Sequence, residues 1–361
     1  MLMLARSISL RTEGACGKNC TKCQLFRTYC PGCITRICLV AKCKRGTTYE
    51  GITSPKSFCR LREYCNNPGR MPENFPNQDK ARLRVQLKLG FPDFIPTISL
   101  TDRRSWFWPD LQVPWIAVRL SEFIKAKDMM PESVCRGLHD FLGFGGKILL
   151  STVMEDEILD RLRPTDYLEM INDIKPDAVM TPDVYTYVDD PLSLSWMQTF
   201  KNVAYARAFA DLSIPVVGLV KGAITKQVTY STEKLCELGC QNFAIPSREL
   251  ILLDLLDGHV LTVTTALRKK GMTPPVVLYG LAYPVRRPRG NMIYSGMSWF
   301  IDAKRGVYYK GNKRAGYITD TYVRFEECGC VACKGRMALD LGDDTRSLAL
   351  HNLQQTLGRF A

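Results

Sequence analysis

The chain has 361 residues, of which 46% are hydrophobic and 24% are charged. This length accommodates one large domain and a small one, and the composition excludes a disordered or fibrous chain. No apolar run reaches the roughly 18 residues of a membrane-spanning helix. The N-terminus, Met1-Leu-Met-Leu-Ala-Arg6, is too short and too soon charged to be a signal peptide. We therefore expect a cytoplasmic protein with no membrane partner.

The positive charge is concentrated in the first quarter of the chain. Of the 49 basic and 36 acidic residues, residues 1–90 contain 17 and 5, which leaves 32 and 31 for the remainder. A basic segment beside a nearly neutral domain is typical of proteins that bind a phosphate backbone. The N-terminal module is therefore predicted to bind nucleic acid, either tRNA or DNA. The alternative is a solvated basic surface whose charge is partly offset by metal-bound thiolates.

The N-terminal module, residues 1–88 with its linker, is rich in cysteine and poor in apolar periodicity. Such a segment needs a metal to stabilise it, and a chain without a secretory segment favours metal over disulfides. Zinc suits the Cys-Pro-Gly-Cys turn at 30–33, whereas the irregular spacing slightly favours an iron–sulfur cluster. The first three cysteines also have the spacing of radical S-adenosylmethionine enzymes. The candidate ligands are a subset of Cys16, Cys20, Cys23, Cys30, Cys33, Cys38 and Cys43, with Cys59 and Cys65 following.

Residues 66–90 are predicted to form a linker followed by a basic helix over about 80–88. From Phe91 onwards, short apolar runs alternate with helical stretches. Repeated βα units over this length predict a (β/α)8 barrel with a parallel sheet. A doubly wound open sheet is the alternative, although no Gly-x-Gly-x-x-Gly follows the first strand. The strands are expected at 94–99, 115–119, 147–151, 178–182, 215–220, 242–246, 275–280 and 291–294.

In a barrel of this kind, function lies at the carboxyl ends of the strands. Few carboxylates are expected there, and a Ser-His-Asp triad is hard to build. His139 and His259 lie within helical stretches and are predicted to be structural. The polar residues expected at this mouth are Thr97, Ser99, Ser151, Thr152, Asp183, Lys221, Ser247, Arg248 and Ser295.

A metal-ligand pattern stands near the C-terminus. Cys328-x-Cys330-x2-Cys333 is followed after 17 residues by His351-Asn-Leu353. Three thiols and one imidazole form a closed tetrahedral set for zinc, with no position left for a substrate. The pattern predicts a structural zinc site.

This pattern resembles the zinc site of the tRNA-guanine transglycosylase family. Phe94-Ile-Pro-Thr resembles the family's first strand, and Val179-Met-Thr-Pro-Asp183 resembles the strand that carries a base-recognising aspartate. Gly218-Leu-Val-Lys-Gly222 is similar to Gly-Ile-Val-Gln-Gly, and Ala244-Ile-Pro-Ser247 stands where the family has Ala-Ile-Gly-Gly. The resemblance covers about residue 94 to the C-terminus. It implies a (β/α)8 barrel with a zinc subdomain, about 289–361, and exchange of guanine for a 7-deazaguanine in tRNA or, in relatives, DNA.

The departures from the family pattern concern its chemistry. By the resemblance, the two carboxylates that attack the ribose and move protons correspond to Ser151 and Ser295, and the base-holding Gln corresponds to Lys221. Asp183 remains, with Ser247 and Arg248 beside it as substrate-binding candidates. Serine is a poor nucleophile at a sugar carbon without a neighbouring base. Two replacements for the missing carboxylates are considered, namely Asp302 and the pair Glu155 and Asp156.

Three functions follow from these observations. The first is a nucleic-acid transglycosylase, a pentosyltransferase with altered site chemistry. The second is a non-catalytic subunit that binds tRNA or DNA and forms a homodimer or a heterodimer with an active transglycosylase. The third is a different iron–sulfur enzyme built on the same barrel.

Overall fold

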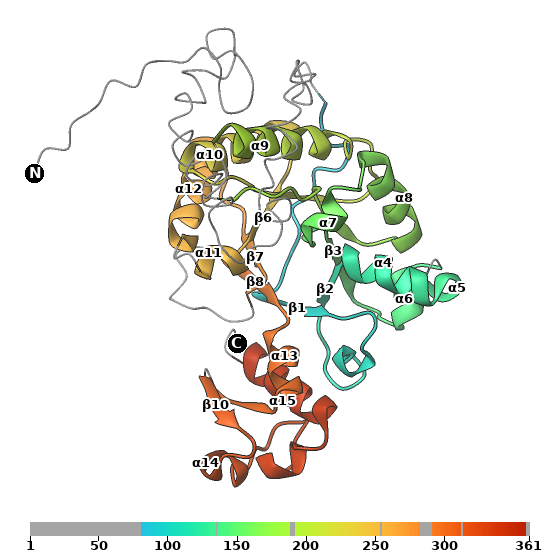
Figure 1. Ribbon diagram of the computed structural model, residues 1–361, viewed down its shortest axis with the longest axis vertical. Helices are drawn as coiled ribbons and strands as arrows, with labels where there is room; N and C mark the ends of the chain where they lie inside the picture. The colour runs from blue at the N-terminus through green and yellow to red at the C-terminus, as the bar shows by residue number, and fades with distance from the viewer. Residues whose placement is uncertain are drawn as a thin grey trace, which may run out of the picture.

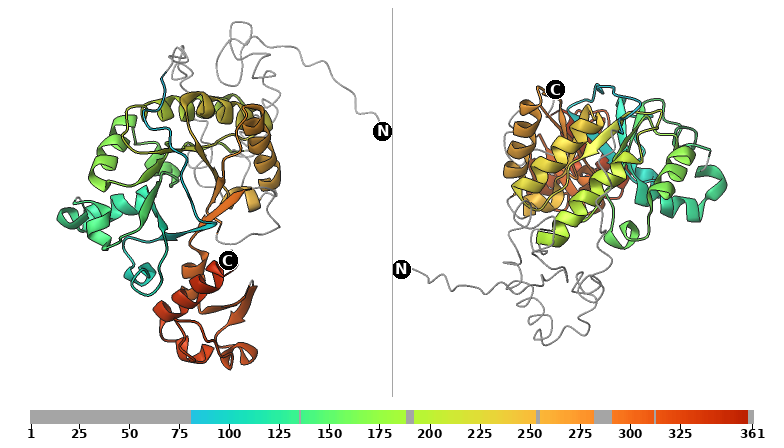
Figure 2. Two further views of the ribbon diagram at one scale, coloured as in Figure 1. Left: turned by 180° about the vertical axis from the view of Figure 1, so that it is seen from behind. Right: turned by 90° about the horizontal axis from the view of Figure 1, so that it is seen from above.

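The computed structural model describes residues 81–134, 136–187, 192–252, 255–281, 291–311 and 313–358. Residues 1–80 of the predicted cysteine-rich module, with all its candidate ligands from Cys16 to Cys65, lie outside these ranges. Figures 1 and 2 show a barrel surrounded by helices, with a smaller C-terminal subdomain at one side of it.

Eight parallel strands close into a barrel in chain order, with β8 paired to β1. All the strands expected from the sequence are present, and the predicted barrel is confirmed. The open doubly wound sheet is wrong, because a sheet of that kind has two unpaired edges. The strands are β1 Phe94–Ile98, β2 Trp115–Arg119, β3 Lys147–Ser151, β4 Ala178–Met180, β5 Val216–Leu219, β6 Asn242–Pro246, β7 Val276–Tyr279 and β8 Met292–Gly296.

Helices follow the strands on the outside of the barrel. Two helices, α7 and α8, follow β3, because Pro164 begins a new helix at its first position and Asp166 accepts a hydrogen bond from the Arg163 N–H at 2.7 Å. The helices around the barrel are α4 Leu120–Met129, α5 Pro131–Val134, α6 Leu138–Leu142, α7 Asp156–Leu159, α8 Pro164–Ile174, α9 Leu192–Arg207, α10 Thr225–Leu238, α11 Arg248–Leu252 and α12 Leu256–Lys269, with a 3-10 turn, η3, at Arg103–Ser105.

Alternate strand residues belong to two separate apolar cores. On β2, Ile116 and Val118 pack outward under the helices, whereas Trp115 and Ala117 pack into the barrel. Side chains alternate along a strand, so Arg119 also points inward, one layer closer to the carboxyl end. The same alternation directs Thr97, Ser151, Tyr279 and Ser295 inward at the mouth.

The amino ends of the strands are covered by residues 81–90, which are extended and not helical. The Leu89 N–H donates to Oδ1 of Asn242 at 2.8 Å, and the Asn242 amide donates to the Leu87 carbonyl at 2.7 Å. The predicted basic helix is therefore wrong over these residues. The segment has no helical apolar repeat, and its backbone bonds to the barrel instead, as with Leu83 to the Leu238 carbonyl at 2.8 Å.

The C-terminal subdomain follows β8 directly. Its helices α13 and α15 pack together beside a two-stranded antiparallel sheet, below the barrel in Figure 1. Among the described residues, none of the helices is both long and apolar enough to cross a bilayer. The elements are α13 Ser298–Lys304, β9 Val307–Lys310, β10 Lys313–Tyr317, α14 Thr321–Arg324, η4 Ala338–Leu341 and α15 Thr345–Leu357.

Candidate functional site

A cavity of about 730 Å³ opens at the carboxyl ends of the barrel strands. It lies where parallel α/β barrels place their ligands. Many of its lining residues follow β4, β5 and β6, and others come from α13 and β10 of the C-terminal subdomain. The polar lining residues on which the following description rests are Thr97, Arg119, Glu155, Asp156, Asp183, Lys221, Ser247, Arg248, Tyr279, Asp302, Arg305 and Arg314.

Asp183 and Lys221 form a buried ion pair on one wall of this cavity. Lys221 Nζ lies 2.9 Å from Asp183 Oδ1, and the two side chains are only 12% and 4% exposed. The same oxygen accepts a hydrogen bond from the Val184 N–H at 2.8 Å. The two residues meet because β4 and β5 are adjacent strands. A buried pair of this kind holds both charges in place at the cavity wall.

The loop that carries Lys221 needs glycine at the next position. A Cβ on Gly222 would lie 2.6 Å from the backbone nitrogen of Val228, which is in the first turn of α10. The Lys221 N–H donates to Ser231 Oγ at 3.2 Å. These contacts hold the end of β5 close against α10. They therefore fix the position of the Lys221 backbone, from which the side chain extends into the cavity.

Ser151 and Ser295 are fully buried and are absent from the residues that line the cavity. Ser151 Oγ accepts a hydrogen bond from the Val153 N–H at 3.2 Å. Ser295 Oγ lies 3.3 Å from Thr97 Oγ1. The two predicted catalytic positions therefore lie at the inner end of the barrel mouth, where they contact neutral hydroxyl and backbone groups.

Asp302 lies on α13 and reaches the cavity although it is only 3% exposed. Its Oδ2 accepts a hydrogen bond from the Tyr309 hydroxyl at 2.6 Å and one from Arg314 Nε at 2.6 Å. Glu155 and Asp156, the other two carboxylates considered above, line the cavity as well. The structure thus brings all three acidic candidates to the same cavity as Asp183.

The remaining predicted residues divide between the cavity and the other end of the barrel. Ser247 and Arg248 line the cavity, as does His259, whose ring nitrogens lie 3.0 and 3.1 Å from the carbonyl oxygens of Leu255 and Gly222. His139 bonds to the Phe144 carbonyl and to Asp177, both at 2.9 Å, away from the cavity. Both histidines have backbone partners, which is the structural role expected for them.

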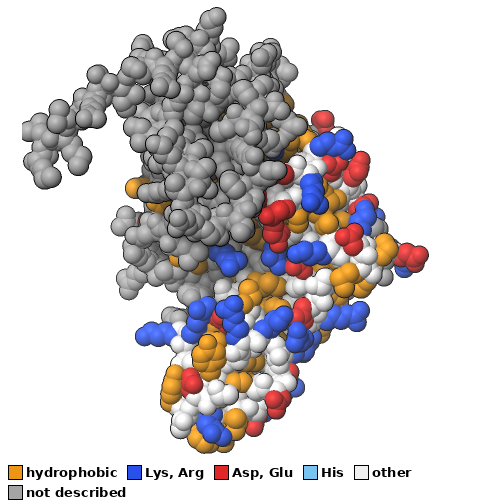
Figure 3. All heavy atoms as spheres, viewed as in Figure 1, with side chains coloured by type: hydrophobic (Ala, Val, Ile, Leu, Met, Phe, Trp, Pro, Cys, Tyr) orange, Lys and Arg blue, Asp and Glu red, His pale blue; other side chains and the backbone are white. Residues whose placement is uncertain are grey.

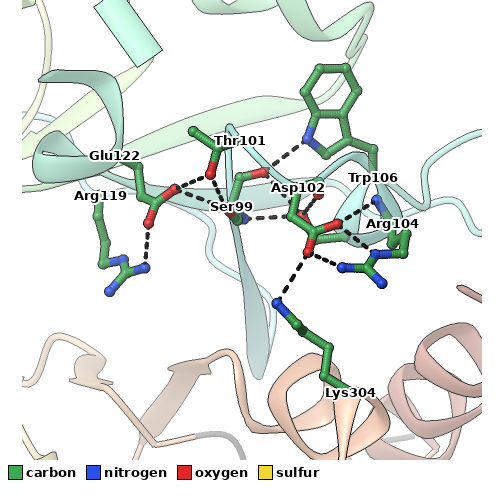
Figure 4. Close-up of polar contacts among 9 residues, drawn as sticks. Ser99, Thr101, Asp102, Arg104, Trp106, Arg119, Glu122 and Lys304 are labelled. Atoms are coloured by element: carbon green, nitrogen blue, oxygen red, sulfur yellow. Dashed lines mark hydrogen bonds and ion pairs between the residues drawn. The ribbon is translucent and has the colours of Figure 1, made fainter. Parts of the chain in front are cut away.

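Sequence reasoning missed Arg119, Glu122 and Tyr279. Arg119 Nη2 donates to Glu122 Oε1 at 2.7 Å, while Glu122 Oε2 accepts from Ser99 Oγ at 2.8 Å (Figure 4). Tyr279 is 5% exposed and lines the cavity. No short sequence motif identifies these three residues. The alternation of side chains along β2 and β7 predicts that Arg119 and Tyr279 point into the barrel, but nothing in the sequence identifies Glu122.

The C-terminal cysteines and His351 form one cluster. Their ligand atoms all lie within 4.8 Å of one another, and His351 Nδ1 is 3.2 Å from Cys333 Sγ and 3.4 Å from Cys330 Sγ. The pKa of Cys330 is lowered, chiefly because Cys333 donates a hydrogen bond to it, and the pKa of Cys333 is raised by the same contact. A thiolate is the form that binds metal. The cluster could therefore hold a metal ion.

The surroundings of His351 also fit a metal ligand. Its Nε2 lies 2.7 Å from the Tyr309 carbonyl oxygen, so Nε2 carries the proton and Nδ1 presents its lone pair to the thiols. The Tyr308 ring stacks on the imidazole with centroids 4.2 Å apart. Three thiolates and one such histidine are the donor set of closed structural zinc sites.

Cations gather between the barrel and the C-terminal subdomain. We define a basic band by Arg103, Arg104, Lys304, Arg305, Arg314 and Arg346. Arg104 and Lys304 both contact Asp102, at 2.8 and 3.3 Å, which joins η3 to α13 (Figure 4). Arg346 contacts Asp110 at 2.8 Å. Figure 3 shows Lys and Arg side chains spread across the region between the two parts of the molecule.

Comparison with known proteins places the chain in no family. No protein-family model matches it, and no curated protein matches it either.

Proposed function

We propose that this protein is a nucleic-acid-binding, transglycosylase-like protein that acts in 7-deazaguanine modification of tRNA or DNA. In this proposal the cavity at the barrel mouth receives the base. The observation that carries the proposal is the buried Asp183–Lys221 pair on the cavity wall, at 2.9 Å. A carboxylate accepts hydrogen bonds from the amide and amino groups of a guanine-like ring, and Lys221 can donate to its oxygen.

The position of the basic band supports a nucleic-acid partner. Arg305 and Arg314 belong to both the band and the cavity lining. A phosphate backbone that follows the band would bring a base to the cavity entrance, because phosphate contacts set the position of a nucleic acid on a protein. The basic N-terminal module would extend this contact, and the cytoplasm, where tRNA is found, is the proposed location.

The metal proposed for the C-terminal cluster is zinc, held by Cys328, Cys330, Cys333 and His351. Its contribution is to the folding of the subdomain, because the set leaves no ligand position open. The N-terminal cysteines are proposed to hold an iron–sulfur cluster or a second zinc ion.

By the resemblance, Ser151 and Ser295 stand at the positions where the family has catalytic carboxylates. Asp302 is the residue proposed to supply a carboxylate in their place. A carboxylate beside the sugar stabilises the positive charge that develops on the anomeric carbon. Asp302 is buried and lines the cavity. Arg314 and Tyr309 hold its Oδ2 in one orientation.

The test is exchange of labelled guanine into tRNA and into duplex DNA by the purified full-length protein. We expect exchange that is lost in Asp302→Asn and Asp183→Asn but kept in Asp173→Asn, whose carboxylate contacts Lys127 at 2.8 Å outside the cavity. Exchange that is unchanged in both cavity variants would overturn the assignment.

A non-catalytic subunit is the second candidate, and the contacts of the serines favour it. Ser151 and Ser295 are fully buried, and within the described residues their hydrogen-bond partners are hydroxyl and backbone groups. This candidate predicts salt-dependent tRNA or DNA binding without exchange, and exchange once an active transglycosylase is added. A colourless protein that contains only zinc would exclude the third candidate, an iron–sulfur enzyme on the same barrel.

A further inference from the structure

We propose that the inner end of the cavity contains an oxyanion-binding subsite, formed by Arg119 and Tyr279, that takes a phosphate group. The subsite uses residues other than Asp183 and Lys221, and it holds whether or not the cavity receives a nucleobase. Free inorganic phosphate and a phosphate ester present the same oxygens, and the experiment below distinguishes these two sources.

Arg119 supplies the first donor. It ends β2 and points into the mouth, and its guanidinium is oriented by the bond from Nη2 to Glu122. Glu122 is held in turn by Ser99, so the guanidinium keeps one orientation (Figure 4). Its Nε is buried and meets no hydrogen-bond partner within the described part of the chain.

Tyr279 supplies the second donor. It ends β7, is 5% exposed and lines the cavity. Its hydroxyl oxygen is buried, and no described residue forms a hydrogen bond of normal geometry with it. Burial raises the pKa of Tyr279, which keeps the hydroxyl protonated. The neighbouring Ser151 and Thr97 hydroxyls and the Arg119 charge lower this pKa and so oppose part of the rise.

These donors define the chemistry of the ligand. Buried polar groups in native proteins nearly always have partners, so two unpaired donors at the end of one cavity indicate a group supplied from outside. An Arg nitrogen can only donate, and the ligand atom must therefore accept. Guanidinium groups pair preferentially with the oxygens of phosphate and carboxylate groups. The Asp183 and Asp302 charges already face Lys221 and Arg314, and Arg119 contacts Glu122 through Nη2, which leaves the Arg119 Nε to donate to a ligand.

The experiment is calorimetric titration of the full-length protein at constant ionic strength with three probes. Inorganic phosphate tests the subsite alone, guanosine 5′-monophosphate tests an ester phosphate, and guanosine controls for the base. We expect saturable binding of at least one phosphate probe. Tyr279→Phe, which removes only the hydroxyl, should weaken it about tenfold, as for the loss of a hydrogen bond to a charged group. Arg119→Gln should weaken it at least as much.

Lys269→Gln is the matched control, because Lys269 is exposed at the end of α12 and does not line the cavity. Its phosphate affinity should stay within about twofold of wild type, as expected for a screened surface charge. Arg119→Lys replaces Arg119→Gln if the latter does not fold, as judged by thermal melting. Asp183→Asn should keep phosphate binding, and loss of guanine binding in that variant would concern the proposed function alone.

Two results would overturn the subsite. The first is the absence of saturable binding of both phosphate probes. The second is binding that Tyr279→Phe leaves unchanged, which would place the anion elsewhere, for example on the basic N-terminal residues.

Discussion

Tyr309 donates a hydrogen bond to Asp302 across 2.6 Å and thereby links the metal cluster to the barrel cavity. The backbone of the same tyrosine faces the cluster, because its carbonyl oxygen lies 2.7 Å from Nε2 of His351. The Tyr309 N–H also donates a hydrogen bond at 3.0 Å to Oδ1 of Asn352, the residue after His351 on α15. One residue of β9 therefore contacts both the cavity carboxylate and the histidine of the cysteine–histidine cluster.

The first prediction concerns this link. Tyr309→Phe removes the hydroxyl but leaves the backbone contact with His351 intact. We expect zinc content to be unchanged and unfolding free energy to fall by about 1–3 kcal/mol, because a hydrogen bond to a buried charged group is lost. Chemical denaturation and metal analysis measure both quantities.

Tyr308→Phe is the matched control for that variant, because it keeps the ring that stacks on His351. Loss of zinc in Tyr309→Phe would contradict the link, because it would show that the hydroxyl serves the metal site and not Asp302.

The second prediction concerns the cluster. Cys330→Ser should remove one equivalent of zinc and unfold the region of α13 to α15, because a closed metal site contributes folding free energy directly. Hydrogen exchange of backbone amides, read by mass spectrometry, should show lost protection after Gly296 and retained protection in β2 to β7.

Cys236→Ser is the control for the loss of a thiol, because Cys236 lies on α10, outside the cluster. It should keep the full metal content. Unchanged thermal stability and zinc content in Cys330→Ser would contradict the structural role of the cluster.

The third prediction is a pH dependence. Hydrogen bonding from Arg104 lowers the pKa of Asp102 to about 2 from an ordinary value of 3.8. A lowered folded pKa contributes stability above the unfolded pKa, and this contribution is lost as pH falls through about 2. Asp102→Asn should therefore be less stable at pH 7 by at most about 1 kcal/mol, since the pair is largely solvated. The difference should shrink between pH 4 and pH 2, and a difference that grows on acidification would be incompatible with this ion pair.

The fourth prediction concerns the basic band. Arg305→Gln should lower the affinity for tRNA or DNA and reduce the slope of log K against log salt by about 1, the effect of losing one phosphate contact. Lys269→Gln is a matched change at the far end of α12, and we expect it to leave the slope unaltered. Equal slopes for all three proteins would remove Arg305 from the interface.

The sequence was sufficient to predict the barrel strands. Parallel strands are buried on both faces, and runs such as Lys147–Ser151 are therefore apolar, short and separated by turn residues. The basic helix over about 80–88 failed for the converse reason. Lys and Arg are good helix formers, but without an apolar stripe nothing holds a helix there, and Asn242 binds the extended segment instead.

The site was only partly predictable. Spacing identified the Cys3His cluster, because cysteines two and three residues apart already lie close together. Asp302, considered only as a replacement, reaches the cavity because α13 begins two residues after β8 ends. Arg119 and Tyr279 were missed because they lie far apart in the sequence and come together only when the barrel closes. No local sequence motif predicts which strand ends will lie near each other.

The most direct measurement of the central claim is calorimetric titration of the full-length protein with guanine and with a 7-deazaguanine base. We expect saturable binding to the wild-type protein and no binding to Asp183→Asn, although that variant should keep its fold, its zinc and its phosphate binding. Absence of binding by the wild-type protein, or equal binding by Asp183→Asn, would contradict the assignment of this cavity as a nucleobase site.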